Sequence, residues 1–169
     1  GVAGGGSGGR STRAGGRLAA LCPPGTYVAT AKSCGGERGE RMRLHRERRD
    51  QRWQTVDAPL DLVRGLREVP DDRAVLVDCL TLWLSNHLLA EHDLDAVSEE
   101  LLDVLRKPRG PWVVVSNEVG LGIVPDNALA RRFRDAAGRL NQRVASVADH
   151  ATFIAAGRPI RLTRSEGSR

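Results

Sequence analysis

Short apolar runs alternate along the chain with longer segments in which apolar residues recur every three or four positions. The short runs have the length and the polar borders of buried β-strands, and they occupy residues 26–30, 74–78, 112–116, 151–155 and 159–162. The longer segments predict helices, at residues 60–67, 80–89, 97–106 and from 126 onward. Strands that alternate with helices predict an α/β fold, with a mainly parallel sheet and helices on both of its faces.

In such a sheet, ligands bind at the edge where the parallel strands end. Asp78 ends one apolar run, which is typical of a carboxylate that holds Mg²⁺ beside a nucleotide and equally of a residue that caps the next helix. Asn117 and Glu118 open the nine-residue segment NEVGLGIVP, which follows another strand and is longer than a turn requires. This segment is either a ligand-binding loop or an ordinary turn before the next helix.

Composition indicates a folded, single-domain protein. Its 169 residues are 40% hydrophobic and 28% charged, and the three cysteines suit neither a zinc site nor a disulfide framework, which favours a reducing compartment. No apolar stretch is long enough to span a membrane, and residues 1–20 lack the apolar core of a signal peptide. We therefore expect one cytoplasmic domain over residues 1–169, with a truncated first strand at residues 1–3 and a flexible tail at 164–169.

A glycine-rich segment near the start has the spacing of a phosphate-binding P-loop, G-x-x-x-x-G-K-[ST], with arginine in place of lysine. Glycines allow successive backbone N–H groups to surround a phosphate, while the cation would reach its oxygens and the final hydroxyl would bind Mg²⁺. A flexible linker has the same composition, and the segment taken alone favours the linker because little apolar chain precedes it. The residues concerned are Gly4, Gly5, Gly6, Ser7, Gly8, Gly9, Arg10 and Ser11.

His45 lies within an arginine-rich stretch, residues 37–53. One interpretation is a solvated helix with interleaved acidic residues. Another is a neutral imidazole that attacks a phosphorus atom, with guanidinium groups offsetting the charge on the phosphate oxygens. The same arginine stretch also suggests a basic, non-catalytic nucleic-acid-binding protein, but the aromatic residues are not interleaved with the arginines as stacking platforms would be.

Five segments taken in order, GGGSGGRS, YVAT, RMRLHRERRDQRW, VLVDCLTLWLSN and VVVSNEVGLGIVPDNALARRFRDAAGRLNQRVA, resemble the bifunctional adenosylcobinamide kinase / adenosylcobinamide-phosphate guanylyltransferase family of cobalamin biosynthesis. The resemblance runs from about Gly4 to Leu162 and is most specific over residues 116–145. It implies a RecA-like, three-layer P-loop NTPase fold, commonly assembled as a homotrimer. It also implies two reactions: GTP or ATP phosphorylates adenosylcobinamide, and GMP passes from GTP, through an enzyme histidine, to adenosylcobinamide phosphate.

The resemblance also implies roles for single residues. His45 stands eight residues before Trp53, the spacing of the family's guanylylated histidine. Arg10 replaces the family's P-loop lysine with a bulkier, planar cation, so a guanylyltransferase without kinase activity, or an inactive relative, is the alternative. Besides Gly4 to Ser11, the implied nucleotide contacts are Thr30, Ala31, Lys32, Arg46, Glu47, Arg48, Arg49, Asp57 and Asp78, with Ser11 and Asp78 as Mg²⁺ ligands.

Overall fold

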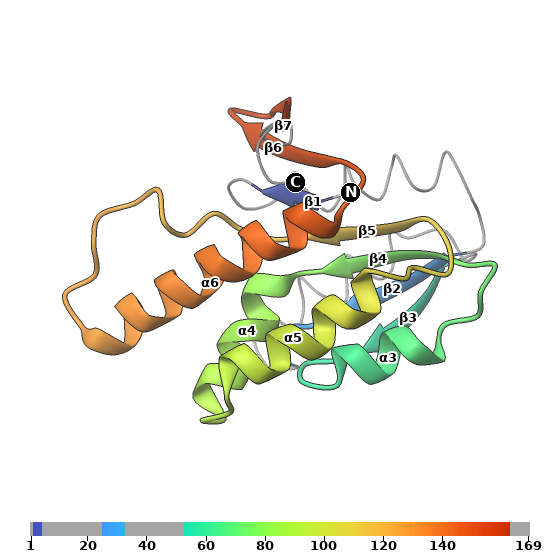
Figure 1. Cartoon of the computed structure of the whole chain (residues 1–169), viewed down its shortest axis with the longest axis horizontal. Coiled ribbons are helices and arrows are strands. Elements are labelled where there is room, and N and C mark those ends of the chain that lie inside the picture. The colour runs from blue at the N-terminus through green and yellow to red at the C-terminus, as the bar shows by residue number, and fades with distance from the viewer. Residues whose placement is uncertain (1, 5–24, 33–52, 163–169) are drawn as a thin grey trace, which may run out of the picture.

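The structure is a computed structural model that describes residues 2–4, 25–32 and 53–162. Its strands are β1 (Val2–Gly4), β2 (Gly25–Ala29), β3 (Trp53–Asp57), β4 (Ala74–Asp78), β5 (Trp112–Val115), β6 (Ala151–Ala155) and β7 (Arg158–Leu162). These described strands form one sheet in the order β3-β2-β4-β5-β1-β6-β7 (Figure 1). All neighbours are parallel except β7, which runs antiparallel to β6.

The expected α/β fold with a mainly parallel sheet is confirmed, and the five strands predicted from apolar runs agree with the structure to within one residue at each end. The strand β3 was not predicted. It lies at the end of the described sheet, with Gln54 and Asp57 exposed and the other three residues only partly buried. A strand in that position carries a weak hydrophobic signal because it has little apolar surface to bury.

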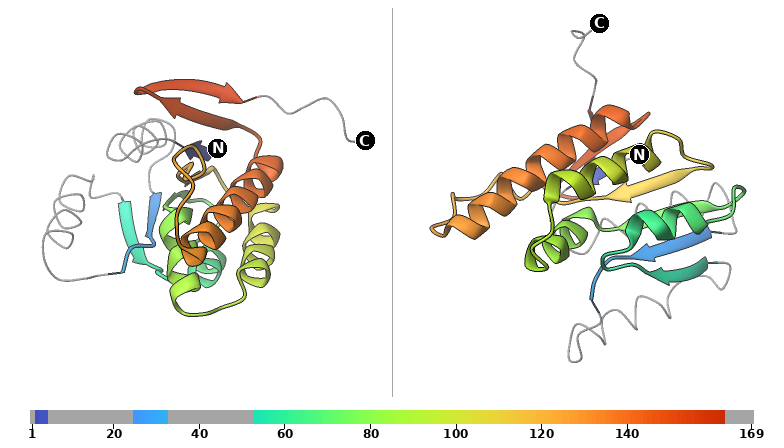
Figure 2. Two further views of the ribbon diagram at one scale, coloured as in Figure 1. Left: turned by 90° about the vertical axis from the view of Figure 1, so that its left-hand side faces the viewer. Right: turned by 60° about the horizontal axis from the view of Figure 1, so that its bottom comes forward.

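Four helices are described: α3 (Leu62–Glu68), α4 (Leu80–Leu89), α5 (Leu94–Leu105) and α6 (Ala128–Val147). All four cover one face of the sheet (Figure 2), and α5 contacts each of the other three. Helices were expected on both faces, whereas the helices of the described residues all lie on one face.

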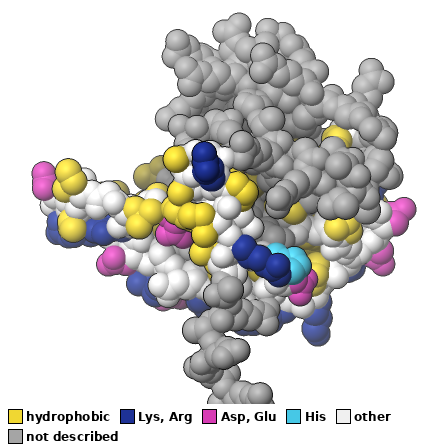
Figure 3. Space-filling view, turned by 90° about the horizontal axis from the view of Figure 1, so that it is seen from above, with side chains coloured by type: hydrophobic (Ala, Val, Ile, Leu, Met, Phe, Trp, Pro, Cys, Tyr) yellow, Lys and Arg dark blue, Asp and Glu magenta, His cyan; other side chains and the backbone are white. Residues whose placement is uncertain are grey.

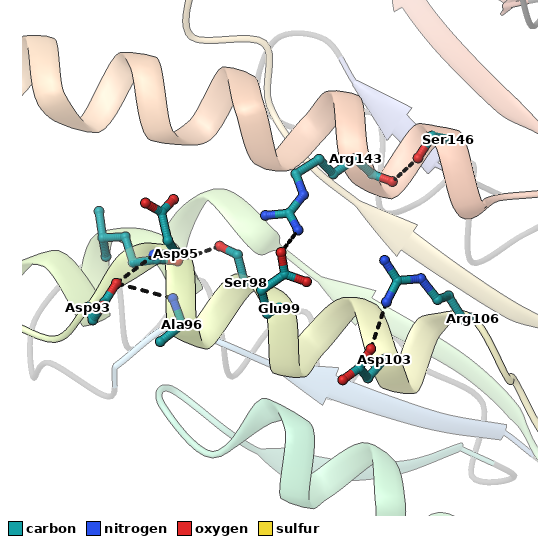
Figure 4. A network of polar contacts seen from close by, with 10 residues as sticks. Asp93, Asp95, Ala96, Ser98, Glu99, Asp103, Arg106, Arg143 and Ser146 are labelled. Carbon is teal, nitrogen blue, oxygen red and sulfur yellow. Dashed lines mark hydrogen bonds and ion pairs between the residues drawn. The ribbon is translucent and has the colours of Figure 1, made fainter. Parts of the chain in front are cut away.

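The helix α5 begins three residues earlier than the expected 97–106. Asp93 caps it, because the Asp93 carboxylate accepts hydrogen bonds from the backbone N–H groups of Asp95, at 3.0 Å, and Ala96, at 3.1 Å (Figure 4). A salt bridge between Arg143 of α6 and Glu99 of α5 joins the two helices, as the same figure shows.

The two faces of the sheet carry different sets of side chains, because successive residues of a strand point in opposite directions. Val28, Val75 and Val114 pack against the helices, together with the fully buried Trp83 of α4. The side chains of the opposite face form a second cluster, Tyr27, Ala29, Leu76, Cys79 and Val115. By the same alternation, Asp78 at the end of β4 belongs to the opposite face.

Candidate active site

The predicted site residues that the structure describes meet at the edge of the sheet where the parallel strands end. The register aligns one residue from each of five strands in a single row, which in sheet order is Asp57, Ala29, Asp78, Val115 and Ala3. The next residue along β2 is Thr30, and the next along β1 is Gly4, where the glycine-rich segment begins. Segments far apart in the sequence therefore end side by side, at the edge where such sheets bind ligands.

Asp78 is half-buried at the end of β4, and its Oδ2 accepts a 2.6 Å hydrogen bond from the Tyr27 hydroxyl. This bond fixes the carboxylate on the face opposite the described helices. Carboxylate oxygens are ligands that Mg²⁺ prefers, and Mg²⁺ commonly takes one or two of them while waters and substrate phosphates fill its other positions. The part of the chain that the structure describes contains no group of three His, Cys, Asp or Glu side chains that would enclose a metal.

Thr30 is fully buried, and its polar groups hold the ends of β2, β4 and α4 together. Its Oγ1 donates to the Cys79 carbonyl, at 2.7 Å, and accepts from the Cys79 N–H, at 2.8 Å. Its own N–H donates to the Asp78 carbonyl, at 3.1 Å, and its carbonyl accepts from Asn86 Nδ2, at 2.8 Å. Through these bonds Thr30 fixes the backbone from which the half-buried Ala31 and the exposed Lys32 continue.

A chain of buried polar side chains connects the end of β5 to α4 and α6. Ser116 Oγ donates to Asn141 Oδ1 of α6, at 2.6 Å, and lies 3.4 Å from Thr81 Oγ1 of α4. The Asn117 N–H donates to Thr81 Oγ1, at 2.8 Å. Asn141 Nδ2 donates to the Asn117 carbonyl, at 3.0 Å, and to Glu118 Oε1, at 3.1 Å. The start of the NEVGLGIVP segment is thus held from both sides.

The rest of that segment projects from the sheet as a loop and is secured by arginines of α6. Arg134 donates to the Gly120 carbonyl, at 2.7 Å, and Arg131 donates to the carbonyls of Pro125, at 2.9 Å, and Asp126, at 2.7 Å. Figure 3 shows hydrophobic side chains gathered on the projecting end formed by this loop and the start of α6. Within the loop, residues Leu121, Ile123 and Val124 are exposed, and Ile123 is the most exposed of these three, at 97%.

Two titratable groups of α4 and its N-cap have shifted pKa values. Burial raises the pKa of the Cys79 thiol, which keeps it protonated and unreactive. Burial also lowers the pKa of His87, whose Nδ1 lies 2.8 Å from Nδ1 of His92, while the nearby Asp61 and Glu100 act in the opposite direction. Because His87 Nε2 lies 3.2 Å from the Leu60 carbonyl, Nε2 donates and Nδ1 of the neutral ring accepts from His92.

The remaining predicted site residues lie outside the described residues, and their roles stay predictions. They are Gly5, Gly6, Ser7, Gly8, Gly9, Arg10, Ser11, His45, Arg46, Glu47, Arg48 and Arg49.

Sequence reasoning missed several residues that shape this edge, namely Tyr27, Thr81, Asn86 and Asn141. The available signal was a polar residue within an apolar pattern. Asn141 is only 8% exposed and follows the buried Leu140 on α6, and a buried amide in that position needs hydrogen-bond partners.

Comparisons with known proteins show the family to which the chain is similar. The family model described as cobinamide kinase / cobinamide phosphate guanyltransferase matches residues 1–162. The bifunctional adenosylcobalamin biosynthesis protein CobP of Pseudomonas aeruginosa is 46% identical over 140 residues, which cover 81% of this chain and 81% of the relative. The proteins named CobU from Salmonella typhimurium and Escherichia coli are 33% and 30% identical, over 95% and 80% of this chain and 97% and 84% of their own lengths.

Proposed function

The chain belongs to the cobinamide kinase / cobinamide phosphate guanyltransferase family, and we propose that it performs both reactions of that family in adenosylcobalamin biosynthesis. It is a nucleotide-binding transferase with a P-loop NTPase-like α/β fold. The observation that carries the proposal is the row at the sheet edge, which brings Asp57 and Asp78 into line with the strand that leads into the glycine-rich segment.

The first reaction transfers the γ-phosphoryl group of GTP or ATP to the hydroxyl of adenosylcobinamide, giving adenosylcobinamide phosphate and a nucleoside diphosphate. In the second, the neutral imidazole of His45 attacks the α-phosphorus of GTP, forms a P–N bond and releases pyrophosphate. The phosphate of adenosylcobinamide phosphate then attacks that phosphorus, the P–N bond breaks, and adenosylcobinamide-GDP leaves.

The nucleotide contacts form at the sheet edge. Backbone N–H groups of the segment from Gly4 to Ser11 surround the phosphates, and the exposed Lys32 brings a cation to the end of β2. Asp78 and the Ser11 hydroxyl hold Mg²⁺, which when bound neutralises charge on the phosphate oxygens. The further contacts of this proposal are Ala31, Arg46, Glu47, Arg48, Arg49 and Asp57, with Arg10 at the phosphates, while the buried Thr30 supports Ala31 and Lys32 from within the fold.

The chain also forms a homotrimer in this proposal. Support comes from the exposed apolar side chains of the projecting loop, since large apolar patches on a soluble protein commonly mark contact surfaces; Leu121 is 75% and Ile123 97% exposed. Light scattering should give three times the 18.3 kDa of the chain, and Ile123→Asp should reduce that mass. A monomer at all concentrations would contradict the trimer.

In the described residues, no helix is both long and apolar enough to cross a membrane.

The product assay tests both activities together. The protein is incubated with adenosylcobinamide, Mg²⁺ and either ATP or GTP, and the corrinoids are separated by chromatography and identified by mass spectrometry. We expect adenosylcobinamide phosphate first and, with GTP, adenosylcobinamide-GDP afterwards. If the protein converts supplied adenosylcobinamide phosphate but does not phosphorylate adenosylcobinamide, the alternative of a guanylyltransferase without kinase activity is supported. Arg10 favours this alternative because a guanidinium group fits less well than an ammonium group between the β- and γ-phosphates.

A further inference from the structure

The segment that follows β5 leaves the sheet between the two proposed nucleotide-binding strands. In the sheet order, β5 separates β4, which ends in Asp78, from β1, which leads into the glycine-rich segment. Val115 is in register with Asp78 on one side and with Ala3 on the other. Glu118 comes three residues later, so its Cα lies within about 10 Å of that row.

The carboxylate of Glu118 is held in place although it is exposed. Its Oε1 accepts a hydrogen bond from Asn141 Nδ2, at 3.1 Å, and the same amide nitrogen binds the carbonyl of Asn117, at 3.0 Å. Asn141 is itself buried and fixed by Ser116. Asn141 thereby fixes the direction of the Glu118 carboxylate just beyond the end of β5, next to the proposed nucleotide-binding strands.

The two reactions differ in their need for a base. The acceptor of the kinase reaction is an alcohol, which must lose a proton to become a phosphate ester. The acceptor of the guanylyl transfer is a phosphate monoester, which is already an anion near neutral pH because its second pKa is about 6. A carboxylate that accepts a proton therefore serves the first reaction alone.

We propose that Glu118 is a catalytic residue of the kinase reaction, an inference that rests on the function proposed above. The hydroxyl oxygen of the acceptor bonds to the γ-phosphorus, the bond from that phosphorus to the β,γ-bridging oxygen breaks, and the hydroxyl proton passes to the Glu118 carboxylate. Asn141 is a positioning residue that acts through Glu118. Asp78, which accepts from Tyr27, keeps its separate role as the proposed metal ligand.

The test compares Glu118→Gln with the wild type in both half-reactions. The kinase kcat should fall by about 100-fold or more, the typical contribution of general base catalysis, while KM for the nucleotide changes by less than about threefold. Guanylyl transfer to supplied adenosylcobinamide phosphate should keep its rate. Glu100→Gln, the same change at an exposed position of α5, should leave both rates unaltered.

Asn141→Leu should lower the kinase kcat as well, without a matching loss of guanylyl transfer. Because Asn141 acts through Glu118, the double variant should be no slower than Glu118→Gln alone. If Asn141→Leu unfolds, as its melting curve will show, Glu118→Gln decides the matter by itself.

A kinase kcat of Glu118→Gln within about threefold of the wild type would overturn the inference. An equal loss in both half-reactions would overturn it too, since it would mean that Glu118 places the nucleotide. A wild-type chain that guanylylates but never phosphorylates would refute the proposed kinase function itself, and with it this role for Glu118.

Discussion

The hydroxyl of Thr30 ties the ends of β2 and β4 together, and Thr30→Val removes it with little change of shape. Thr30 is fully buried, so water cannot replace the hydroxyl. The Cys79 N–H and carbonyl each lose a bond, of 2.8 Å and 2.7 Å. The Cys79 carbonyl keeps a second hydrogen bond, from the Trp83 N–H at 3.2 Å. The Cys79 N–H is therefore the group that loses its hydrogen-bond partner in the variant.

The size of the effect follows from these two bonds. A buried donor without a partner costs about 1–3 kcal/mol, and the bond lost at the carbonyl adds about 0.5–1.5 kcal/mol. The added methyl group returns less than about 1 kcal/mol. We therefore expect Thr30→Val to lower the free energy of unfolding by about 2–3 kcal/mol, which for a chain of this size lowers Tm by about 4–12 °C.

Urea denaturation followed by circular dichroism measures this change, with Thr30→Ser as the control because serine keeps the hydroxyl. Thr30→Val should unfold at a clearly lower urea concentration than Thr30→Ser, with an unchanged m-value. A valine variant as stable as the serine variant would refute the reasoning, since it would show that the hydroxyl contributes nothing at this edge.

Three further predictions concern other parts of the molecule. Gly25→Ala should destabilise the pairing of β2 and β3 by about 1–3 kcal/mol, because a Cβ would lie 2.5 Å from the Trp53 ring; an unchanged urea midpoint would contradict this. The pKa of His87 is lowered in the folded protein, so as the pH falls the imidazole is protonated in the unfolded chain before it is protonated in the folded one. The free energy of unfolding should therefore fall as the pH drops below about 6.5, by at most about 1.4 kcal/mol per pH unit. His87→Gln should flatten that part of the pH profile, and an equal slope in both proteins would show that other groups cause it. Asp78→Asn keeps an oxygen for Tyr27 and should reduce nucleotide turnover much more than Tm, whereas unchanged turnover with a large drop in Tm would make Asp78 a purely structural residue.

Two kinds of element could be predicted from the sequence: helices that bury one stripe of side chains, and strands that bury side chains on both faces. The runs at β4 and β6 were predicted to the residue because continuous apolar residues between polar borders have few other uses. The start of α5 was placed too late because its first turn depends on the Asp93 cap rather than on apolar spacing. The strand β3 was missed because its exposed Gln54 and Asp57 and its position at the end of the described sheet hide the strand pattern.

The candidate site was only partly predictable, for a different reason. Asp78 and Asn117 were singled out because they lie at the ends of predicted strands, where ligands bind. The contacts that fix them join residues distant in the chain, such as Tyr27 with Asp78 and Asn141 with Glu118. Periodicity reports which face of an element is buried, but it contains no information about which polar group of another element lies opposite.

The guanylyl-histidine is the central claim, and covalent labelling tests it most directly. The protein is incubated with α-labelled GTP and Mg²⁺, denatured, and freed of nucleotide before the label is counted. We expect a label that is lost in acid and stable in base, as a P–N bond requires, which is absent in His45→Ala and retained when His87, His92 or His150 is replaced by alanine. A wild-type protein that never becomes labelled, or a label that persists in His45→Ala and disappears with another histidine, would contradict the account.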